Sequence, residues 1–255
     1  MLLRRIIPTL LLKDFGLVKT KKFSKPKYIG DPINAVRIFN EKETDELILL
    51  YISASNKKPN FELISKIAEE CFMPLTYSGG VRTIEDIKTI INLVIEKVSI
   101  NSMFFDDPNF IRRAVDSFGS STIIVSIDIK RNIWGKQGVS AYSGTKSKKI
   151  DVLDYALLTE KNGAGEIFIN SIDKNGMKTG YDVQLLKTIS ENISVPIIAC
   201  GGVSSYMDFK NVFLNTNVSA CATGSIFVFH GNHDAVLISY PNPIELRDII
   251  DINKN

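Results

Sequence analysis

Asp128 is the carboxylate of this 255-residue chain that is best placed for acid–base chemistry. It ends an apolar run, Thr122–Asp128, with the composition of a buried β-strand. In barrels of alternating strands and helices, catalytic groups lie at the carboxyl ends of strands. An internal repeat aligns Asp128 with Leu11, 117 positions earlier, so leucine stands where a second carboxylate would complete an acid–base pair. A capping or loop-pinning role for Asp128 stays open.

Glycines and hydroxyl-bearing residues also fall where apolar runs end. Gly79-Gly80 and Gly201-Gly202 occupy matching places in the repeat. Glycine there lets backbone N–H groups approach a ligand closely. Thr223-Gly224-Ser225 follows the last run, with a helix expected over Ile226–Phe229, and its counterpart is Ser99-Ile100-Asn101-Ser102. We predict two phosphate half-sites for a ligand with a phosphate at each end; tight turns alone are the alternative.

Eight β-rich runs that alternate with amphipathic stretches must position these residues. The runs are Ile6–Leu12, Leu47–Ile52, Pro74–Ser78, Lys97–Asn101, Thr122–Asp128, Glu166–Asn170, Val195–Ala199 and Ser219–Ala222. The amphipathic stretches include Asn60–Glu70, Ile84–Leu93, Asp107–Ser117 and Val183–Glu191. This alternation indicates parallel strands joined by crossover helices. The continuous apolar runs are typical of strands buried on both faces.

The repeat favours a closed barrel over an open sheet. Leu75–Val81 resembles Ile197–Val203, and Ile6–Lys13 resembles Ile123–Lys130. The first four strands therefore map onto the last four, which an open doubly wound sheet would not show. The sequence predicts an α/β protein with one domain, residues 1–255. That domain is a (β/α)8 TIM barrel with half-barrels of about 1–119 and 120–255.

Two long segments follow the first and fifth strands. Lys13–Gly30 is rich in lysine and includes Lys19. It is either a solvated charged loop or a mobile lid over an anionic ligand. Arg131–Lys149 is an insertion that we expect over the ligand face, with a small hairpin over Trp134–Tyr142.

Composition argues against several classes of partner. The chain has 31 basic and 28 acidic residues and a formal charge of +3, which predicts no nucleic-acid binding. Cys71, Cys200 and Cys221 form no CxxC pair, and His230 and His233 lack ligands at metal-binding spacing, so we expect no metal and no cofactor. No apolar run approaches the roughly 20 residues that span a bilayer, and the N-terminus lacks the order of a signal peptide. We expect a cytoplasmic protein without a membrane partner.

A further set of motifs is spread over nearly the whole chain. They are Arg5-Ile6-Ile7-Pro8, Gly30-Asp31-Pro32, Asp45-Glu46-Leu47, Lys97-Val98-Ser99-Ile100-Asn101, Ile127-Asp128, Gly163-Ala164-Gly165-Glu166-Ile167, Gly176, Gly180-Tyr181-Asp182, Cys200-Gly201-Gly202 and Ser225-Ile226-Phe227. Together they resemble the cyclase subunit of imidazole glycerol phosphate synthase. The resemblance implies a glutaminase partner that releases ammonia, which crosses the barrel core and attacks a bisphosphorylated substrate at the far end.

The resemblance also assigns roles at the two ends of the barrel. Arg5, Glu46, Lys97 and Glu166 each begin a predicted strand and match the family's charged ammonia gate. Two positive and two negative groups would balance one another, as buried charges must. Ordinary surface charges at strand starts are the alternative.

At the substrate end, Asp128 matches one of the two aspartates that the family uses, and Leu11 replaces the other. Tyr51 stands in place of an aspartate and Asn170 in place of a threonine, so ordinary cyclase chemistry is in doubt. The residues that we expect to bind phosphate or substrate are Lys19, Gly79, Gly80, Ser99, Asn101, Asn170, Gly176, Gly201, Gly202, Thr223, Gly224 and Ser225.

These departures lead to three hypotheses. The first is a paralogue that works with a glutaminase subunit and passes ammonia to a third enzyme, an amidotransferase that builds acetamidino sugars for surface polysaccharide. The second is genuine histidine biosynthesis with a relocated acid–base group. The third is a non-catalytic scaffold that activates the glutaminase.

Overall fold

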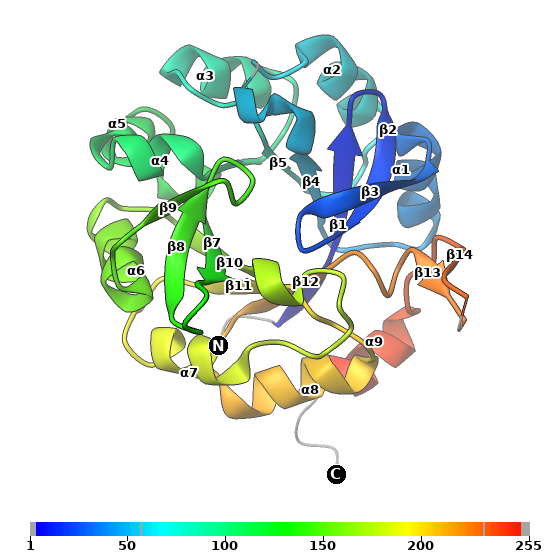
Figure 1. Ribbon diagram of the computed structural model, residues 1–255. Coiled ribbons are helices and arrows are strands. Elements are labelled where there is room, and N and C mark those ends of the chain that lie inside the picture. Colours follow the sequence, from blue (N-terminus) through cyan, green and yellow to red (C-terminus); the bar gives the residue numbers. More distant parts are fainter. Residues whose placement is uncertain (1–3, 57, 232, 251–255) are drawn as a thin grey trace.

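The computed structural model describes residues 4–56, 58–231 and 233–250. Eight parallel strands form a closed ring, because β10 pairs with both β11 and β7 (Figure 1). In chain order the ring strands are β1 (Arg5–Lys13), β4 (Leu47–Tyr51), β5 (Leu75–Ser78), β6 (Lys97–Ile100), β7 (Ile123–Arg131), β10 (Glu166–Ser171), β11 (Ile197–Cys200) and β12 (Ala220–Thr223). The predicted (β/α)8 TIM-barrel fold is confirmed, and each strand overlaps its predicted run.

Helices cover the outside of this ring (Figure 1). They are α1 (Pro32–Glu41), α2 (Phe61–Glu69), α3 (Ile84–Asn92), α5 (Asn109–Phe118), α6 (Val152–Lys161), α7 (Val183–Ser190), α8 (Tyr206–Asn215) and α9 (Pro243–Ile250), with the short α4 (Ser102–Asp106) after β6. Single 3-10 turns are η1 (Ile52–Asn56), η2 (Ser120–Thr122) and η3 (Ile172–Lys174). Side-chain caps fix the helix starts: Asp31 accepts from the Asn34 N–H, and Thr83 and Asp86 form a reciprocal capping box on α3.

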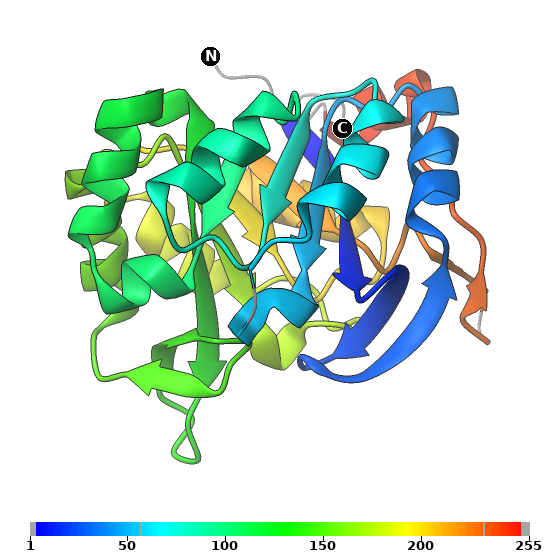
Figure 2. The same ribbon diagram turned by 90° about the horizontal axis from the view of Figure 1, so that it is seen from above.

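β1 and β7 run on beyond the ring into antiparallel hairpins on the same end of the barrel (Figure 2). β2 (Gly16–Lys21) and β3 (Ser24–Gly30) extend β1, and β8 (Gln137–Ala141) and β9 (Lys146–Lys148) extend β7. The segment after the first strand is therefore not a solvated loop. Its strand β2 buries Leu17 and Val18 against β1, whereas most of β3 is exposed.

Two details of the sequence prediction need correction. The hairpin in the insertion is formed by β7 with β8, so its turn spans 132–136 and its second strand begins only at Gln137. No helix begins at Ile226–Phe229. One turn closes from the Phe229 N–H to the Ser225 carbonyl, and the chain then enters β13 (Phe229–His230), paired with β14 (Ala235–Val236). The carbonyls of Phe227 and Val228 accept from the N–H groups of residues 239 and 237 instead of from a following helical turn.

The inside of the barrel is filled in layers. Side chains alternate along a strand, so β1 points Arg5, Ile7, Thr9 and Leu11 inward in turn. Ile7 belongs to an inner apolar cluster with Phe168 and with Ile48, Ile124, Ile198, Cys200, Ala220 and Ala222. This cluster separates a charged layer at the amino ends of the strands from a polar layer at their carboxyl ends.

Candidate functional site

Asp128 lies buried near the end of β7 and faces the barrel interior. The Asn170 amide on the adjacent strand β10 donates to its Oδ1 at 3.3 Å. Burial raises the pKa of Asp128 from 3.8 to about 7, and the hydrogen bond from Asn170 opposes that shift. The carboxyl group can therefore gain or lose a proton near neutral pH, as a general acid or base must.

A cavity of about 340 Å³ opens beside Asp128 at the carboxyl ends of the strands. Leu11 and Leu50 line its apolar part, and Asp128 is the only carboxylate among the described residues that line it. Leu11 thus presents a buried hydrocarbon side chain where the family resemblance predicts a carboxylate. Tyr51 lines the same cavity, and burial raises the pKa of its phenol, so the group stays neutral at physiological pH.

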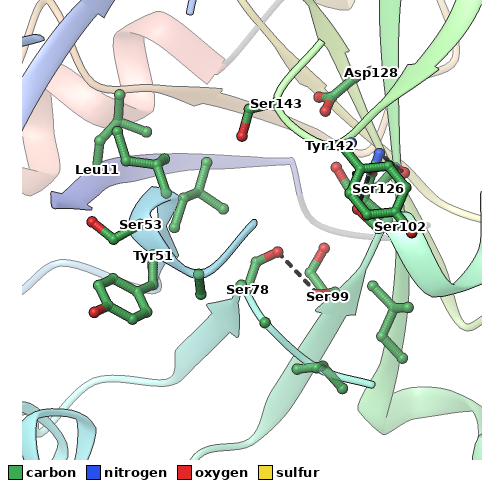
Figure 3. Close-up of a pocket in the computed structure, with 18 of the residues that line it drawn as sticks. Leu11, Tyr51, Ser53, Ser78, Ser99, Ser102, Ser126, Asp128, Tyr142 and Ser143 are labelled. Carbon is green, nitrogen blue, oxygen red and sulfur yellow. Dashed lines mark hydrogen bonds between the residues drawn. The ribbon is translucent and has the colours of Figure 1, made fainter. Parts of the chain in front are cut away.

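Neutral hydroxyls provide most of the polar lining of this cavity (Figure 3). They belong to Ser53, Ser78, Ser99, Ser102, Ser126 and Ser143, with the phenol of Tyr142. Tyr142 and Ser143 come from the turn between β8 and β9, which the sequence analysis did not assign to the site. Its signal was the length of the insertion, which has to fold over the face that it follows.

A second, smaller pocket of about 30 Å³ adjoins the cavity and shares Leu11, Thr20, Leu50 and Asn170 with it. It contains the predicted half-site at the ends of the last two ring strands. The predicted residues that line it are Lys19, Asn170, Gly176, Gly201, Gly202, Thr223, Gly224 and Ser225. The structure thus brings this half-site together.

Lys19 is the buried cation of the smaller pocket. Its Nζ donates to the Thr9 carbonyl at 3.3 Å, and burial lowers its pKa from 10.5 to about 8. A Cβ at Gly224 would lie 1.6 Å from that Nζ and 2.3 Å from the Thr9 oxygen, so only glycine fits there. A partly desolvated ammonium group beside an exposed backbone is suited to an oxyanion.

The other half-site, Gly79, Gly80, Ser99 and Asn101, lines the large cavity. Gly79 has a φ of 129°, and a Cβ there would lie 2.4 Å from the Tyr51 carbonyl oxygen. The Asn101 amide donates to the Ser126 carbonyl at 2.9 Å. The two pockets share four lining residues, so the two predicted half-sites lie next to each other.

The four charged residues at strand starts meet at the opposite end of the barrel. Arg5 contacts Glu46 at 2.6 Å and Glu166 at 2.9 Å, and Lys97 contacts the same two carboxylates at 3.4 and 3.3 Å. Positive and negative groups therefore alternate around a closed ring, which we call the charged ring. One acceptor, Glu166 Oε2, is buried without a hydrogen-bond partner in the described part of the chain.

Neither a metal centre nor a membrane-spanning helix is present in the described part of the chain. Within residues 4–56, 58–231 and 233–250, no three histidine, cysteine, aspartate or glutamate side chains are grouped to hold a metal ion. None of the helices there has both the length and the apolar character needed to cross a membrane.

Sequence comparisons relate this chain to known proteins. The fold and the site define a (β/α)8 barrel with a ligand space at the carboxyl ends of its strands and a charged ring at the other end. The sequence model of the family described as "Histidine biosynthesis protein" matches residues 5–234. A Pseudomonas aeruginosa protein with the provisional name imidazole glycerol phosphate synthase subunit hisF2 is 54% identical over 244 residues, covering 95% of this chain and 97% of that protein.

Two relatives carry the plain name imidazole glycerol phosphate synthase subunit HisF. The Lactococcus lactis protein is 39% identical over 230 residues, 89% of each chain. The Alkaliphilus metalliredigens protein is 35% identical over 232 residues, 90% of this chain and 92% of its own. The chain therefore belongs to the HisF family of imidazole glycerol phosphate synthase subunits, and the resemblance found in the sequence is confirmed.

The charged ring generates a stability prediction. Replacing Lys97 with alanine leaves two carboxylates to share Arg5, and an unbalanced charge in a buried pair costs roughly 3–5 kcal/mol. We expect Lys97→Ala to lower the free energy of unfolding by about that amount in urea titrations. Lys66→Ala, which removes the exposed ion pair with Glu62, should change it by less than about 0.5 kcal/mol. Equal effects of the two substitutions would contradict a buried, coupled ring.

The raised pKa of Asp128 generates a pH prediction. Between about pH 4 and pH 7 the unfolded chain has released this proton and the folded chain still holds it, so stability falls as pH rises through that window. Asp128→Asn should remove this fall. At about pH 8 the variant should be more stable than the parent by up to roughly 4 kcal/mol, with little gain near pH 4. Urea unfolding at both pH values measures this, with exposed Asp116→Asn as control; parallel profiles would refute it.

Proposed function

We propose that this chain is an ammonia-conducting subunit that works with a glutaminase and has lost ordinary cyclase chemistry. The observation that carries the proposal is a closed charged ring at one end and, at the other, a cavity in which Asp128 is the one carboxylate among the described lining residues. A barrel that kept only its fold would not need the ring, because apolar residues fill such a space at least as stably. A cyclase that uses paired acid–base groups would need a second carboxylate in place of Leu11.

The inner layers support a path for ammonia. Neutral ammonia could pass a ring of paired charges and an apolar core, whereas hydrated ions are excluded by desolvation. On this proposal, ammonia enters past Lys97, moves beside the side chains around Phe168 and arrives near Asp128. The acceptor would be a phosphorylated ligand or a third enzyme. In the pathway that we propose, the ammonia goes to acetamidino sugars of surface polysaccharide.

The face around the charged ring has features that suit a protein partner. Phe72 and Val94, in the connections that enter β5 and β6, are 84% and 88% exposed. A contiguous exposed apolar patch marks a protein interaction site, and we propose that these two side chains belong to such a patch beside the charged ring. We propose that the glutaminase subunit covers them in a heterodimer.

The partner interface can be tested by weakening it from this side. We expect Phe72→Asp to weaken binding of a glutaminase subunit about tenfold or more, because an aromatic anchor is replaced by a charge. Trp134→Asp, which changes an aromatic of similar exposure in the β7–β8 turn, should leave the affinity unchanged. Calorimetry on the two purified subunits gives both values. Equal losses, or a loss for Trp134 only, would place the partner elsewhere.

Phosphate binding can be tested at Gly224. A methyl group there collides with the Thr9 carbonyl and with the Lys19 ammonium group, so Gly224→Ala should weaken binding of inorganic phosphate at least tenfold. Gly138→Ala is the matched control, because the nearest atom to its new Cβ is 3.8 Å away. Calorimetric titration measures both variants, and undiminished affinity in Gly224→Ala would rule out this half-site.

The histidine-pathway alternative predicts an ordinary rate of cyclisation, and the names of the HisF relatives favour that alternative. With ammonium as nitrogen source, we expect cyclisation of the bisphosphorylated histidine intermediate to be about 10²–10⁴-fold slower than in an ordinary cyclase, the usual loss for a missing acid–base group. Leu11→Asp alone should not restore the rate, because Tyr51 and Asn170 still differ. Steady-state kinetics measures this rate, and a cyclisation rate equal to that of an ordinary cyclase would contradict the proposal.

A further inference from the structure

We infer that the carboxyl end of the barrel is a docking surface for a second protein partner, one that has an acidic face and an apolar pocket. On the proposed function this partner is the enzyme that accepts ammonia, so the inference rests on that function for the partner's role. The location and the chemistry of the surface follow from the two hairpins that extend β1 and β7.

The first observation is a one-sided distribution of charge. The segments Lys13–Gly30 and Arg131–Lys149 hold 11 of the 31 basic residues and one of the 28 acidic residues. Their formal charge is therefore +10, against +3 for the whole chain, which leaves −7 for the rest. All of these basic side chains except Lys19 and Lys148 are exposed. In the described part of the chain, no ion pair involves a lysine of either segment.

The second observation is a stiff turn that displays two apolar side chains. The turn between β7 and β8 projects from the end of the barrel and carries Ile133 and Trp134, which are 93% and 85% exposed (Figure 2). The side-chain oxygen of Asn132 accepts from the N–H groups of Trp134 and Lys136 at 2.9 and 3.0 Å. The Asn132 carbonyl also accepts from Gly135 at 2.9 Å. A turn that only joins two strands does not need an exposed tryptophan, whose burial is strongly favourable.

The base of this hairpin is fixed to the connection between β10 and α7. The Arg131 N–H donates to Asp173 at 2.6 Å, and its guanidinium pairs with Asp182 at 2.8 Å. The Gln137 amide donates to the same Asp182 carboxylate at 2.8 Å. The apolar tip is therefore held in one position before any partner binds. Such pre-organisation reduces the entropy lost on association, and a rigid tryptophan is a typical anchor of a protein interface.

These features favour an acidic protein as the occupant. A basic rim around an aromatic anchor is complementary to a surface that has the opposite charge and a pocket for the ring. Residues of both hairpins line the large cavity, so a partner that covers the hairpins lies over the ligand. An anionic membrane offers the same charge. It has no pocket that requires a tip of fixed geometry, and it would cover the opening of the cavity.

The test begins with the complete chain bound to its glutaminase, with photoreactive benzoylphenylalanine in place of Trp134. Cross-linking in the cells that produce the protein identifies the partner that contacts the tip. The same substitution at Phe72 is the control, because we expect it to cross-link the glutaminase at the other end of the barrel. The protein captured at position 134 is then purified, and its rates of binding to the unmodified barrel and its variants are measured.

We expect losses of two kinds with this purified protein. Trp134→Ala should raise the Kd at least tenfold, mainly through faster dissociation, because it removes the anchor. Lys22→Glu combined with Lys25→Glu should slow association about tenfold at ~0.05 M salt, with a smaller difference at ~0.5 M. Lys88→Glu, which reverses an exposed lysine on α3, is the matched control and should change neither rate.

Support requires a protein that is cross-linked at position 134 and that shows both losses. No cross-linked protein, or an affinity that Trp134→Ala leaves unchanged, overturns the inference. So does binding to phosphatidylglycerol vesicles with a blue shift in the emission of Trp134, the only tryptophan of the chain, when no protein is cross-linked. A barrel that binds its glutaminase and inorganic phosphate but no second protein would keep the glutaminase partnership and the phosphate site and remove this docking surface alone.

Discussion

The closed ring of eight strands imposes the constraint on which the rest of the structure depends. Once β10 pairs with β7, every second side chain of every strand points into a space that admits only a few side chains in each layer. Each layer is then stabilised by a different kind of interaction. Apolar groups around Phe168 pack without partners, whereas the charges below them are stable only because they alternate in sign.

The same closure explains why the two ends of the barrel can change independently. The apolar layer separates the charged ring from the cavity, so Leu11 at one end shares no contact partner with Arg5 and Lys97 at the other end. Substitutions without shared partners act nearly additively. The residue types at one end of the barrel can therefore change while the charged ring at the other end is kept.

Much of the fold could be predicted from the sequence because each ring strand is marked by a local sequence pattern. Apolar runs bounded by turn residues located all eight, and the repeat indicated closure. The contact of Arg5 with Glu46 and Glu166 could also be predicted, because all three residues begin strands around the same axis. The hairpin turn that brings Tyr142 and Ser143 to the cavity depends on how far β7 extends past the ring, which composition does not encode. The run Ile226–Phe229 does not form the expected helix, because a short apolar segment suits a helix or a strand equally.

Asp128, the one carboxylate among the described residues that line the cavity, is in a different electrostatic state from one of a pair. Two facing carboxylates titrate as a coupled unit, and one is held protonated by the charge of the other. With Leu11 opposite, no such repulsion acts on Asp128, and burial against hydrocarbon raises its pKa instead. A dyad divides the roles of acid and base between two groups, but here one group has to take both in turn. One carboxyl group with a pKa of about 7 can donate a proton and later accept one, but it cannot do both at the same moment as a pair can.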